Sequence, residues 1–240
     1  MSFYNEIADY YDLIFPFNSG HVDFVKSCVG ESYQVKKLLD VGCGTGDLAI
    51  ALSDIGFHVI GIDYDSAMLG RAERKRRGHV VFMRIDMRHI SSAFSQSSFD
   101  AVLCFGNTLV HLSNFLEVDA FCKQVKTVLN EKGKFLLQIL NYDYILDRDI
   151  KKLPLIEDGS IKFERTYEYD DAKNMIAFKT KLIVKETGRE IENEISLYPM
   201  RKSELTVALI NAGFTEISFY ADFNKSKLEQ DSLPLVVQAL

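Results

Sequence analysis

Short apolar runs alternate with segments of helical periodicity from Lys37 to Ile139. Such an alternation predicts βαβ units, whose right-handed crossovers build a parallel sheet. Continuous apolar runs such as VLCF fit strands of a sheet that helices cover on both faces. The pattern therefore favours an α/β core. In order, its segments are KKLLDV, DLAIALSDI, VIGID, SAMLGRAERKRR, VVFMRID, FDAVLCF, FLEVDAFCKQVKTVL and GKFLLQI.

The pattern changes after Asn141, where three β-rich runs follow one another without helical segments between them. Asp170–Asp171 and Gly188 separate these runs, so a meander is expected rather than further βαβ units. We interpret the runs as an antiparallel β lobe that is inserted after the fifth strand of the core. They are IKFERTYEYD, MIAFKTKLIVKE and REIENEISLYP.

The core pattern resumes beyond the lobe. Ser203 is expected to cap a helix from about Glu204 to Asn211, and Gly213 to close it. Two final strands, FTEISFY and LPLVVQAL, complete a seven-stranded, mostly parallel sheet with helices on both faces and an antiparallel C-terminal strand pair. The expected parts are the N-terminal helices and α/β core (1–149), the inserted lobe (150–199) and the return to the core (200–240).

The charge balance and the apolar stretches limit the expected partners. Lys and Arg number 28 against 34 Asp and Glu, and the resulting net charge of -6 argues against a nucleic-acid partner. The uncharged stretch Ala101–Leu116 is shorter than a membrane span of ~20 residues. The start, SFYNEIADYYDLIFPF, is broken by acids and Pro16, unlike a signal peptide. We therefore expect a cytoplasmic protein without a membrane partner; the oligomeric state is left open.

The spacing of cysteines and histidines predicts no metal site. The four cysteines lie 15, 61 and 18 residues apart, which matches neither a set of zinc ligands nor a short disulfide framework. The five histidines lack the i, i+4 pairing of a metalloprotease helix. A reducing compartment fits these cysteines best. The residues are Cys28, Cys43, Cys104, Cys122, His21, His58, His79, His89 and His111.

A glycine-rich loop, LLDVGCGTGDLA, joins the first expected strand to the next helix. Asp40, Gly42, Gly44 and Gly46 lie at this junction, where residues without a Cβ let a ligand approach the backbone closely. The dinucleotide fingerprint needs a third glycine at position 47, where this chain has Asp47. Since a carboxylate there repels pyrophosphate, the loop favours a cationic or neutral ligand over a nicotinamide dinucleotide.

Asp63 ends the second expected strand, 19 residues after Gly44. A carboxylate at this place can accept hydrogen bonds from both hydroxyls of a ribose. Dinucleotide sites share this feature, so Asp63 predicts a nucleoside without deciding which one.

The segment from Lys37 to Ile139 resembles the class I S-adenosylmethionine-dependent methyltransferases. Five of that family's motifs recur in order: LLDVGCGTG, VIGIDYDSAML, RIDM, FDAVLCFGNTLVHL and LNEKGKFLLQI. The resemblance implies a Rossmann-like core with S-adenosylmethionine as cofactor and S-adenosylhomocysteine as product. The methionine part of the cofactor is then expected at the loop of Asp40, Gly42, Cys43, Gly44 and Gly46.

The same resemblance assigns the nucleoside part of the cofactor. It implies that Asp63 binds the ribose, that Tyr64 and Met68 flank the adenine, and that Asp86 with the Met87 backbone reads the adenine amine; Phe105 is expected near the cofactor. Each has a structural alternative. Met68 fits a core position, Asp86 fits a helix cap, and Cys43 fits a small loop residue without a reactive thiolate.

Motifs beyond the core resemble the glycine and sarcosine N-methyltransferases. They are FGNTLVHL, NYDYIL, SLYP and ADFN, in that family's usual order. The resemblance implies N-methylation of an amino acid or a similar amine, a substrate contact at Asn141, and a place for Tyr198 in the substrate site. The lobe is then expected to cover the substrate. An O- or C-methyltransferase of another small metabolite and a non-catalytic S-adenosylmethionine-binding regulatory protein stay open as alternatives.

Further candidates follow from what methyl transfer requires, which is positioning of a neutral lone pair and exclusion of water. His111 follows the fourth strand and could orient or deprotonate the nucleophile. Asn141 could help to orient it, and Tyr10 offers a hydroxyl. Arg165 and Arg201 could hold an acidic group of the substrate with a bidentate fork. The structural alternatives are a core hydrogen bond for His111, an aromatic packing face for Tyr10 and Tyr11, and surface ion pairs for both arginines.

Overall fold

Five neighbouring parallel strands form most of the larger sheet in the computed structural model, which describes residues 3–30 and 36–240. Within those residues the sheet has seven strands in the order β10-β11-β5-β4-β1-β2-β3, and β11 pairs antiparallel with both β5 and β10. The predicted fold class is confirmed. The strands are β1 (Lys37–Val41), β2 (His58–Asp63), β3 (Val80–Arg84), β4 (Phe99–Cys104), β5 (Leu129–Leu140), β10 (Ile217–Tyr220) and β11 (Pro234–Ala239).

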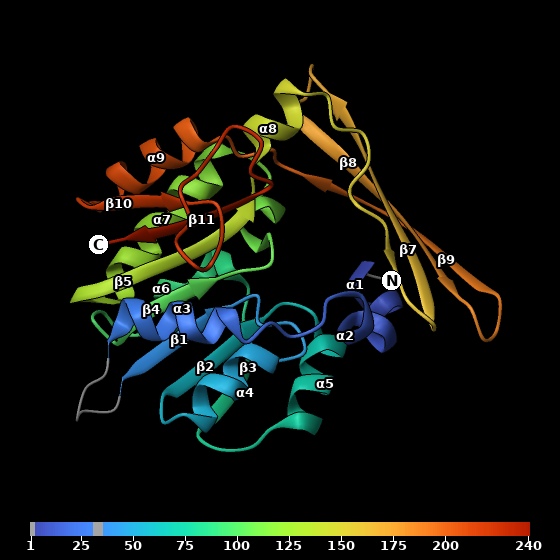
Figure 1. Cartoon of the computed structure of the whole chain (residues 1–240). Coiled ribbons are helices and arrows are strands. Elements are labelled where there is room, and N and C mark those ends of the chain that lie inside the picture. Colours follow the sequence, from blue (N-terminus) through green and yellow to red (C-terminus); the bar gives the residue numbers. More distant parts are fainter. Residues whose placement is uncertain (1–2, 31–35) are drawn as a thin grey trace.

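Helices cover both faces of this sheet because neighbouring residues along each strand point to opposite sides (Figure 1). Leu38 of β1 packs in the cluster of α3, α4 and α5, whereas Leu39 packs in the cluster of α6, α7 and α9. Both leucines are fully buried. The helices are α3 (Gly20–Val29), α4 (Asp47–Asp54), α5 (Ser66–Lys75), α6 (Ile90–Ala93), α7 (Phe115–Val128) and α9 (Lys202–Asn211), and short turns η2 (Met87–His89) and η3 (Thr108–His111) follow β3 and β4.

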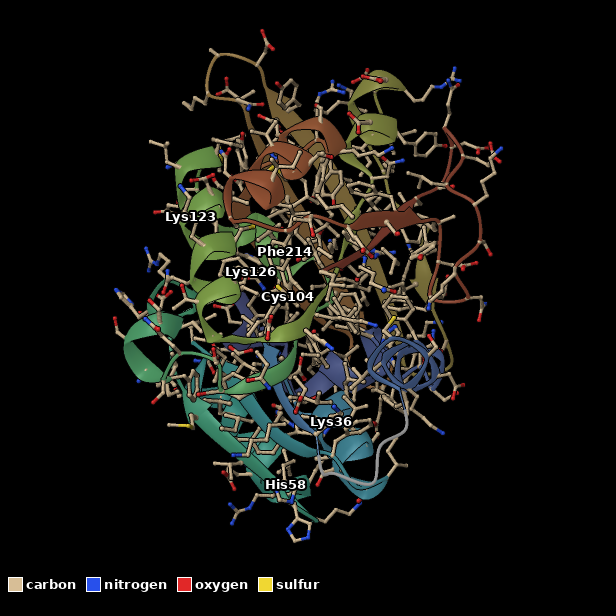
Figure 2. All side chains as sticks on the ribbon, turned by 90° about the vertical axis from the view of Figure 1, so that its left-hand side faces the viewer. Lys36, His58, Cys104, Lys123, Lys126 and Phe214 are labelled. Carbon is tan, nitrogen blue, oxygen red and sulfur yellow. The ribbon has the colours of Figure 1, made fainter. Side chains whose placement is uncertain are left out.

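The α7 and α9 layer is visible in Figure 2 from the side where the parallel strands begin. Lys126 of α7 lies over the ring of Phe214, with the Nζ atom 4.7 Å from the ring centroid. The ammonium group therefore makes a cation–π contact at the end of this apolar layer. Lys36 and His58 mark the amino ends of β1 and β2 in the same view. Across the described part of the chain, no helix has the length and apolarity that crossing a membrane requires.

The inserted lobe is an antiparallel sheet in the order β6-β7-β8-β9, which joins the core through α8 (Tyr142–Asp147) and the chain after Leu197. Its three long strands match the predicted runs; the short β6 was not foreseen. All four strands lie within 150–199. They are β6 (Ile156–Glu157), β7 (Ile161–Asp170), β8 (Met175–Val184) and β9 (Arg189–Leu197).

The N-terminal segment consists of α1 (Phe3–Ile7), η1 (Ala8–Tyr10) and α2 (Tyr11–Ile14). It lies between the lobe and the carboxyl ends of the parallel strands, on the right of Figure 1. There α1 packs against β9 and α5, and α2 packs against β7. The edge at which open α/β sheets bind ligands is therefore covered by two elements from distant parts of the chain.

The last core helix begins earlier than the sequence predicts. Helix α9 starts at Lys202, with Arg201 rather than Ser203 at its N-cap. The carboxylate of Glu204 accepts a hydrogen bond from the backbone N–H of Arg201 at 3.2 Å, which closes the first turn ahead of Ser203. At the other end, Gly213 adopts a φ of +93° and stops the helix as expected.

Candidate active site

The glycine loop between β1 and α4 has a backbone conformation and close neighbours that leave no room for side chains at its glycines. Gly42, Gly44 and Gly46 adopt φ angles of +71°, +56° and +84°. A Cβ at Gly42 would lie 2.4 Å from Cγ2 of Thr108, and one at Gly46 would lie 2.5 Å from Cζ of Phe82. The loop is therefore held tightly between neighbouring elements, as a site for close backbone approach requires.

Asp63, at the end of β2, accepts two backbone hydrogen bonds. Its Oδ2 accepts from the N–H of Gly44 at 2.9 Å, and its Oδ1 accepts from the N–H of Asp65 at 2.8 Å. One lone pair on each oxygen is used, which leaves acceptor capacity for two ribose hydroxyls. Burial raises the pKa of Asp63. The carboxylate thus joins the glycine loop to β2, and its assignment to the ribose stays a prediction.

Asp40, the penultimate residue of β1, is only 3% exposed. Burial and the charge of Asp63 raise the pKa of Asp40 to about 7. The buried Asp40 and the partly buried Asp63 repel each other as carboxylates beside the glycine loop, and a cation bound near both would relieve that repulsion. The donor set therefore fits S-adenosylmethionine, which carries a positive sulfonium and an ammonium group, and disfavours an anionic dinucleotide.

The predicted adenine-flanking residues occupy different environments. Tyr64 is 65% exposed, and the guanidinium carbon of Arg84 lies 5.4 Å from its ring centroid. Met68 is 2% exposed, and its methyl carbon is 3.4 Å from where a Cβ on Gly44 would stand. Tyr64 therefore offers a free aromatic face, while Met68 combines a core position with contact to the loop.

Asp86 follows β3 and caps η2, which is the helix-cap alternative to a role in adenine binding. Its carboxylate accepts from the backbone N–H of Arg88 at 2.9 Å and from the Arg88 side chain through Nε and Nη2. These hydrogen bonds lower the pKa of Asp86. Met87 is the first residue of η2. Reading of the adenine amine by Asp86 and Met87 stays a prediction, since the cap and the ion pair already account for the carboxylate.

Cys43 and Phe105 are both packed against neighbours. Burial raises the pKa of the Cys43 thiol, so the residue carries no reactive thiolate. Phe105, after β4, is 7% exposed, and its ring centroid lies 5.0 Å from that of Phe223 and 5.8 Å from that of His21. Aromatic rings from three distant segments of the chain therefore form a cluster that covers one side of the strand ends.

The N-terminal segment brings two tyrosines to the site. The Tyr4 hydroxyl and Nε2 of His111 share a hydrogen bond of 2.8 Å. Burial lowers the pKa of His111 to about 4, so the imidazole is neutral near pH 7. The Tyr11 hydroxyl oxygen is 3.7 Å from where a Cβ on Gly44 would stand, directly beside the glycine loop. Burial, and next the charge of Asp63, raise the pKa of Tyr11.

Polar contacts fasten the same segment to the core. Asp12 accepts a hydrogen bond from Thr45 of the glycine loop and pairs with Lys75 of α5 at 2.8 Å. Lys75 also pairs with Asp47 at 2.7 Å, so the acid that departs from the dinucleotide fingerprint is neutralised within the protein. Asp9 forms a second ion pair with α5 through Arg71.

Tyr10, the predicted catalytic tyrosine, packs against an apolar cluster that contains Ile7, Phe163 and Leu182, as do Tyr4 and Tyr11. Tyr4 also contacts His111, and Tyr11 also lies beside Gly44. The catalytic role of Tyr10 stays a prediction. Adjacent tyrosines in one short helical stretch gave no signal for choosing between them, and Tyr4 was not considered.

Asn141 is 5% exposed and uses both ends of its amide within the protein. Its Nδ2 donates to the carbonyl of Ser232 at 2.9 Å, and its Oδ1 caps α8 by accepting from the N–H of Tyr144 at 3.4 Å. The residue joins the end of β5 to the loop before β11. Its contact with the substrate stays a prediction.

Asn107 was missed by the sequence reasoning, although its motif FGNTLVHL was recognised. It adopts a left-handed φ of +66° after β4. Its Oδ1 accepts from the N–H of Leu140 at 3.0 Å, and its Nδ2 donates to the Tyr142 hydroxyl at 3.0 Å. The carboxyl ends of β4 and β5 are thereby tied together beneath the lobe.

The two predicted arginines differ in their partners. Nη1 of Arg201 lies 2.9 Å from the carboxylates of both Asp143 and Asp147, an arrangement that joins α9 to α8. Tyr198 has a similar structural contact, since its hydroxyl donates to Glu204 at 2.8 Å. Arg165, on β7, donates through Nη2 to the carbonyl of Pro154 at 2.7 Å. The substrate-clamp hypothesis is therefore better matched by Arg165 than by Arg201.

Comparison with known proteins identifies the family. Residues 38–133 match the family model described as a methyltransferase domain. A protein of Geobacillus sp. (strain WCH70) that has methyltransferase in its name is 30% identical over 205 residues, covering 78% of this chain and 77% of that protein. The glycine/sarcosine N-methyltransferase of Aphanothece halophytica is 27% identical over 225 residues, covering 87% of this chain and 76% of the relative.

A solved structure extends the similarity to the whole fold. The S-adenosylmethionine-dependent methyltransferase from Clostridium acetobutylicum ATCC 824 superimposes with a TM-score of 0.81 at 18% identity, covering 99% of this chain and 98% of that one. Lobe and core are thus shared as one architecture. The glycine loop, the acidic residues beside it and the covered strand edge of the present protein fit an enzyme that transfers a methyl group from S-adenosylmethionine. The chain belongs to the class I S-adenosylmethionine-dependent methyltransferases.

Proposed function

We propose that this methyltransferase acts on the nitrogen of a small amine, with an amino acid as the preferred acceptor. The observation that carries the proposal is the layer of neutral hydrogen-bonding groups, Tyr4, Tyr11 and His111, between the glycine loop and the lobe. Such a layer suits a neutral amine, which needs orientation more than activation. The name of the Aphanothece halophytica relative supports the same acceptor class.

S-adenosylmethionine supplies an electrophilic methyl group on a positively charged sulfur. The acceptor nitrogen must then present a neutral lone pair within ~3 to 3.5 Å of the methyl carbon. The Tyr4 hydroxyl and Nε2 of His111 share a hydrogen bond that holds the N-terminal segment against the end of β4. We assign this pair the task of keeping the segment closed over the bound amine, which excludes water from the reacting atoms.

The lobe and the N-terminal segment limit the size of the acceptor. Phe15 of the segment meets Phe163 of β7 with ring centroids 6.0 Å apart, so the two covers touch each other as well as the core. A bulky protein or RNA target would have to separate them, whereas a small metabolite need not. The net charge of -6 also disfavours a nucleic acid.

Release of S-adenosylhomocysteine across a substrate panel tests this function. The panel contains glycine, sarcosine, other amino acids, simple amines and hydroxylated metabolites, and the products are identified by mass. We expect turnover with amine-bearing members and methylation at nitrogen. Turnover confined to hydroxylated members would point to O-methylation. Tight cofactor binding without turnover of any member would favour the non-catalytic regulatory protein.

A further inference from the structure

One polar row crosses the face of the lobe that turns toward the core. Arg165 of β7 pairs in register with Thr180 of β8, and Thr180 pairs with Asn193 of β9. Directly paired residues project to the same face of a sheet, so these three side chains stand side by side. The rows on either side are apolar: Phe163, Leu182 and Ile191 on one, and Tyr167, Phe178 and Ile195 on the other.

Each member of the polar row carries a buried polar atom without a hydrogen-bond partner. The atoms are Nε of Arg165, Oγ1 of Thr180 and Nδ2 of Asn193, and within residues 3–30 and 36–240 no other buried side-chain nitrogen or oxygen lacks a partner. Thr180 is 5% exposed. Buried polar groups are normally satisfied, because leaving one unpaired costs the full desolvation penalty. Three such atoms in one cross-strand row therefore indicate a partner outside the chain.

Charges on the opposite face of the same strands are paired. Lys179 contacts Glu168 at 2.5 Å, and Lys181 contacts Glu190 at 2.6 Å. The unsatisfied atoms are thus confined to the inner face and do not reflect a general shortage of partners in the lobe.

The inner face is where an acceptor substrate would lie. On one side of the polar row, Phe163 meets Phe15 of the N-terminal segment, with ring centroids 6.0 Å apart. On the other side, the Tyr167 ring lies 6.5 Å from that of Tyr142, which follows β5. The row therefore lies between the part of the lobe that the segment covers and the part that meets the carboxyl ends of the strands.

The chemistry of the three atoms selects the ligand. Nε of Arg165 and Nδ2 of Asn193 can only donate hydrogen bonds, and the Thr180 hydroxyl can donate as well. The bond from Nη2 of Arg165 to Pro154 holds the guanidinium in place without neutralising it. Converging donors with one positive charge match a group that has two acceptor oxygens and a negative charge. The geometry points to a carboxylate subsite at Arg165, Thr180 and Asn193, which, resting on the proposed amine methylation, makes the acceptor an amino acid.

Acetate and glycine titrations of the complex with S-adenosylhomocysteine test the subsite, using isothermal calorimetry. Thr180→Val removes the hydroxyl, Asn193→Leu removes the side-chain amide, and Lys179→Gln on the outer face is the matched control. We expect each inner-face variant to bind acetate at least tenfold more weakly, and the control to bind like wild type. Each inner-face variant should melt at or above the wild-type temperature, because an unpartnered buried atom is replaced by an apolar one.

Methyl transfer to glycine and to methylamine, measured on the same proteins, separates the subsite from the proposed function. The subsite predicts that KM for glycine rises at least tenfold in the inner-face variants while KM for methylamine stays unchanged. Acetate affinity equal in wild type and variants, or absent from wild type, would overturn the subsite even if glycine is methylated. If wild type binds acetate, the inner-face variants bind it more weakly, and no amine is turned over, the result would support the subsite and contradict N-methylation.

Discussion

The Tyr4 hydroxyl and Nε2 of His111, which are 107 residues apart in the sequence, form a hydrogen bond with 2.8 Å between the oxygen and the nitrogen. Their rings also meet edge to face, with centroids 5.5 Å apart. This contact joins the N-terminal segment to the turn that follows β4. The segment is therefore part of the site, and its removal would expose the strand ends to water.

Tyr4→Phe removes the hydroxyl and keeps the ring. We expect kcat/KM for the amine substrate to fall ~10- to 100-fold, because the hydrogen bond that holds the segment over the site is lost, while the affinity for S-adenosylhomocysteine changes by less than a few-fold. Tyr10→Phe is the matched control and should stay close to wild type. Steady-state kinetics and calorimetry on both variants check this; a larger loss for Tyr10→Phe would restore Tyr10 as the catalytic tyrosine.

Asp63→Ala should weaken binding of S-adenosylmethionine by ~2 kcal/mol or more, about 30-fold, since it removes the acceptors for the ribose and the anchor of the Gly44 N–H. Asp65→Asn keeps the oxygen that caps α5 and is the control. Calorimetric titration measures both affinities. Unchanged affinity in Asp63→Ala would exclude the ribose role, and NAD is expected not to bind wild type.

The affinity for S-adenosylmethionine should depend on pH through Asp40. Its pKa in the free protein is about 7, and a bound cation favours the ionised carboxylate, so binding releases a proton. Affinity therefore rises with pH below about 7, by at most tenfold per unit, and levels off above. Titrations in buffers of different ionisation enthalpy count the released proton. Asp40→Asn should abolish this release; a flat profile in wild type would contradict the assignment.

The same carboxyl group sets a pH dependence of stability in the free protein. A raised folded-state pKa means that the folded protein binds the proton more tightly than the unfolded chain does, so stability falls as pH rises from about 4 to about 7. Asp40→Asn has no such titration. Its melting temperature relative to wild type should therefore be higher at pH 8 than at pH 5, which thermal unfolding without cofactor at both values measures. An equal difference at the two values would count against the buried, protonated Asp40.

Arg201→Gln should leave substrate recognition intact. Its guanidinium pairs with Asp143 and Asp147 on a partly exposed surface, where such pairs contribute ~0 to 1 kcal/mol. We expect a small loss of unfolding free energy and an unchanged KM for the amine. Arg165→Lys, by contrast, should raise that KM at least tenfold, because a point charge cannot reproduce the Nε donor. The reverse ranking of the two variants would move the clamp to Arg201.

The sequence by itself determined the core fold and the cofactor. Alternating strand and helix patterns imply one topology, because crossovers are right-handed and the carboxyl ends of parallel strands converge. The glycines at positions 42, 44 and 46 could be recognised without tertiary information, since positive φ angles in a strand-to-helix turn favour residues without a Cβ. Asp40 and Asp63 follow from the same local geometry at the ends of β1 and β2.

Only the tertiary structure decided which polar side chains are free to act. Asn141, Tyr198 and Arg201 are all polar in sequence, yet their hydrogen-bonding groups are engaged by Ser232, Glu204, Asp143 and Asp147, which lie between 6 and 91 residues away. Thr180 and Asn193 are ordinary strand residues until register places them beside Arg165. Whether a polar group is satisfied depends on every neighbour in space, and one-dimensional periodicity carries no record of those neighbours.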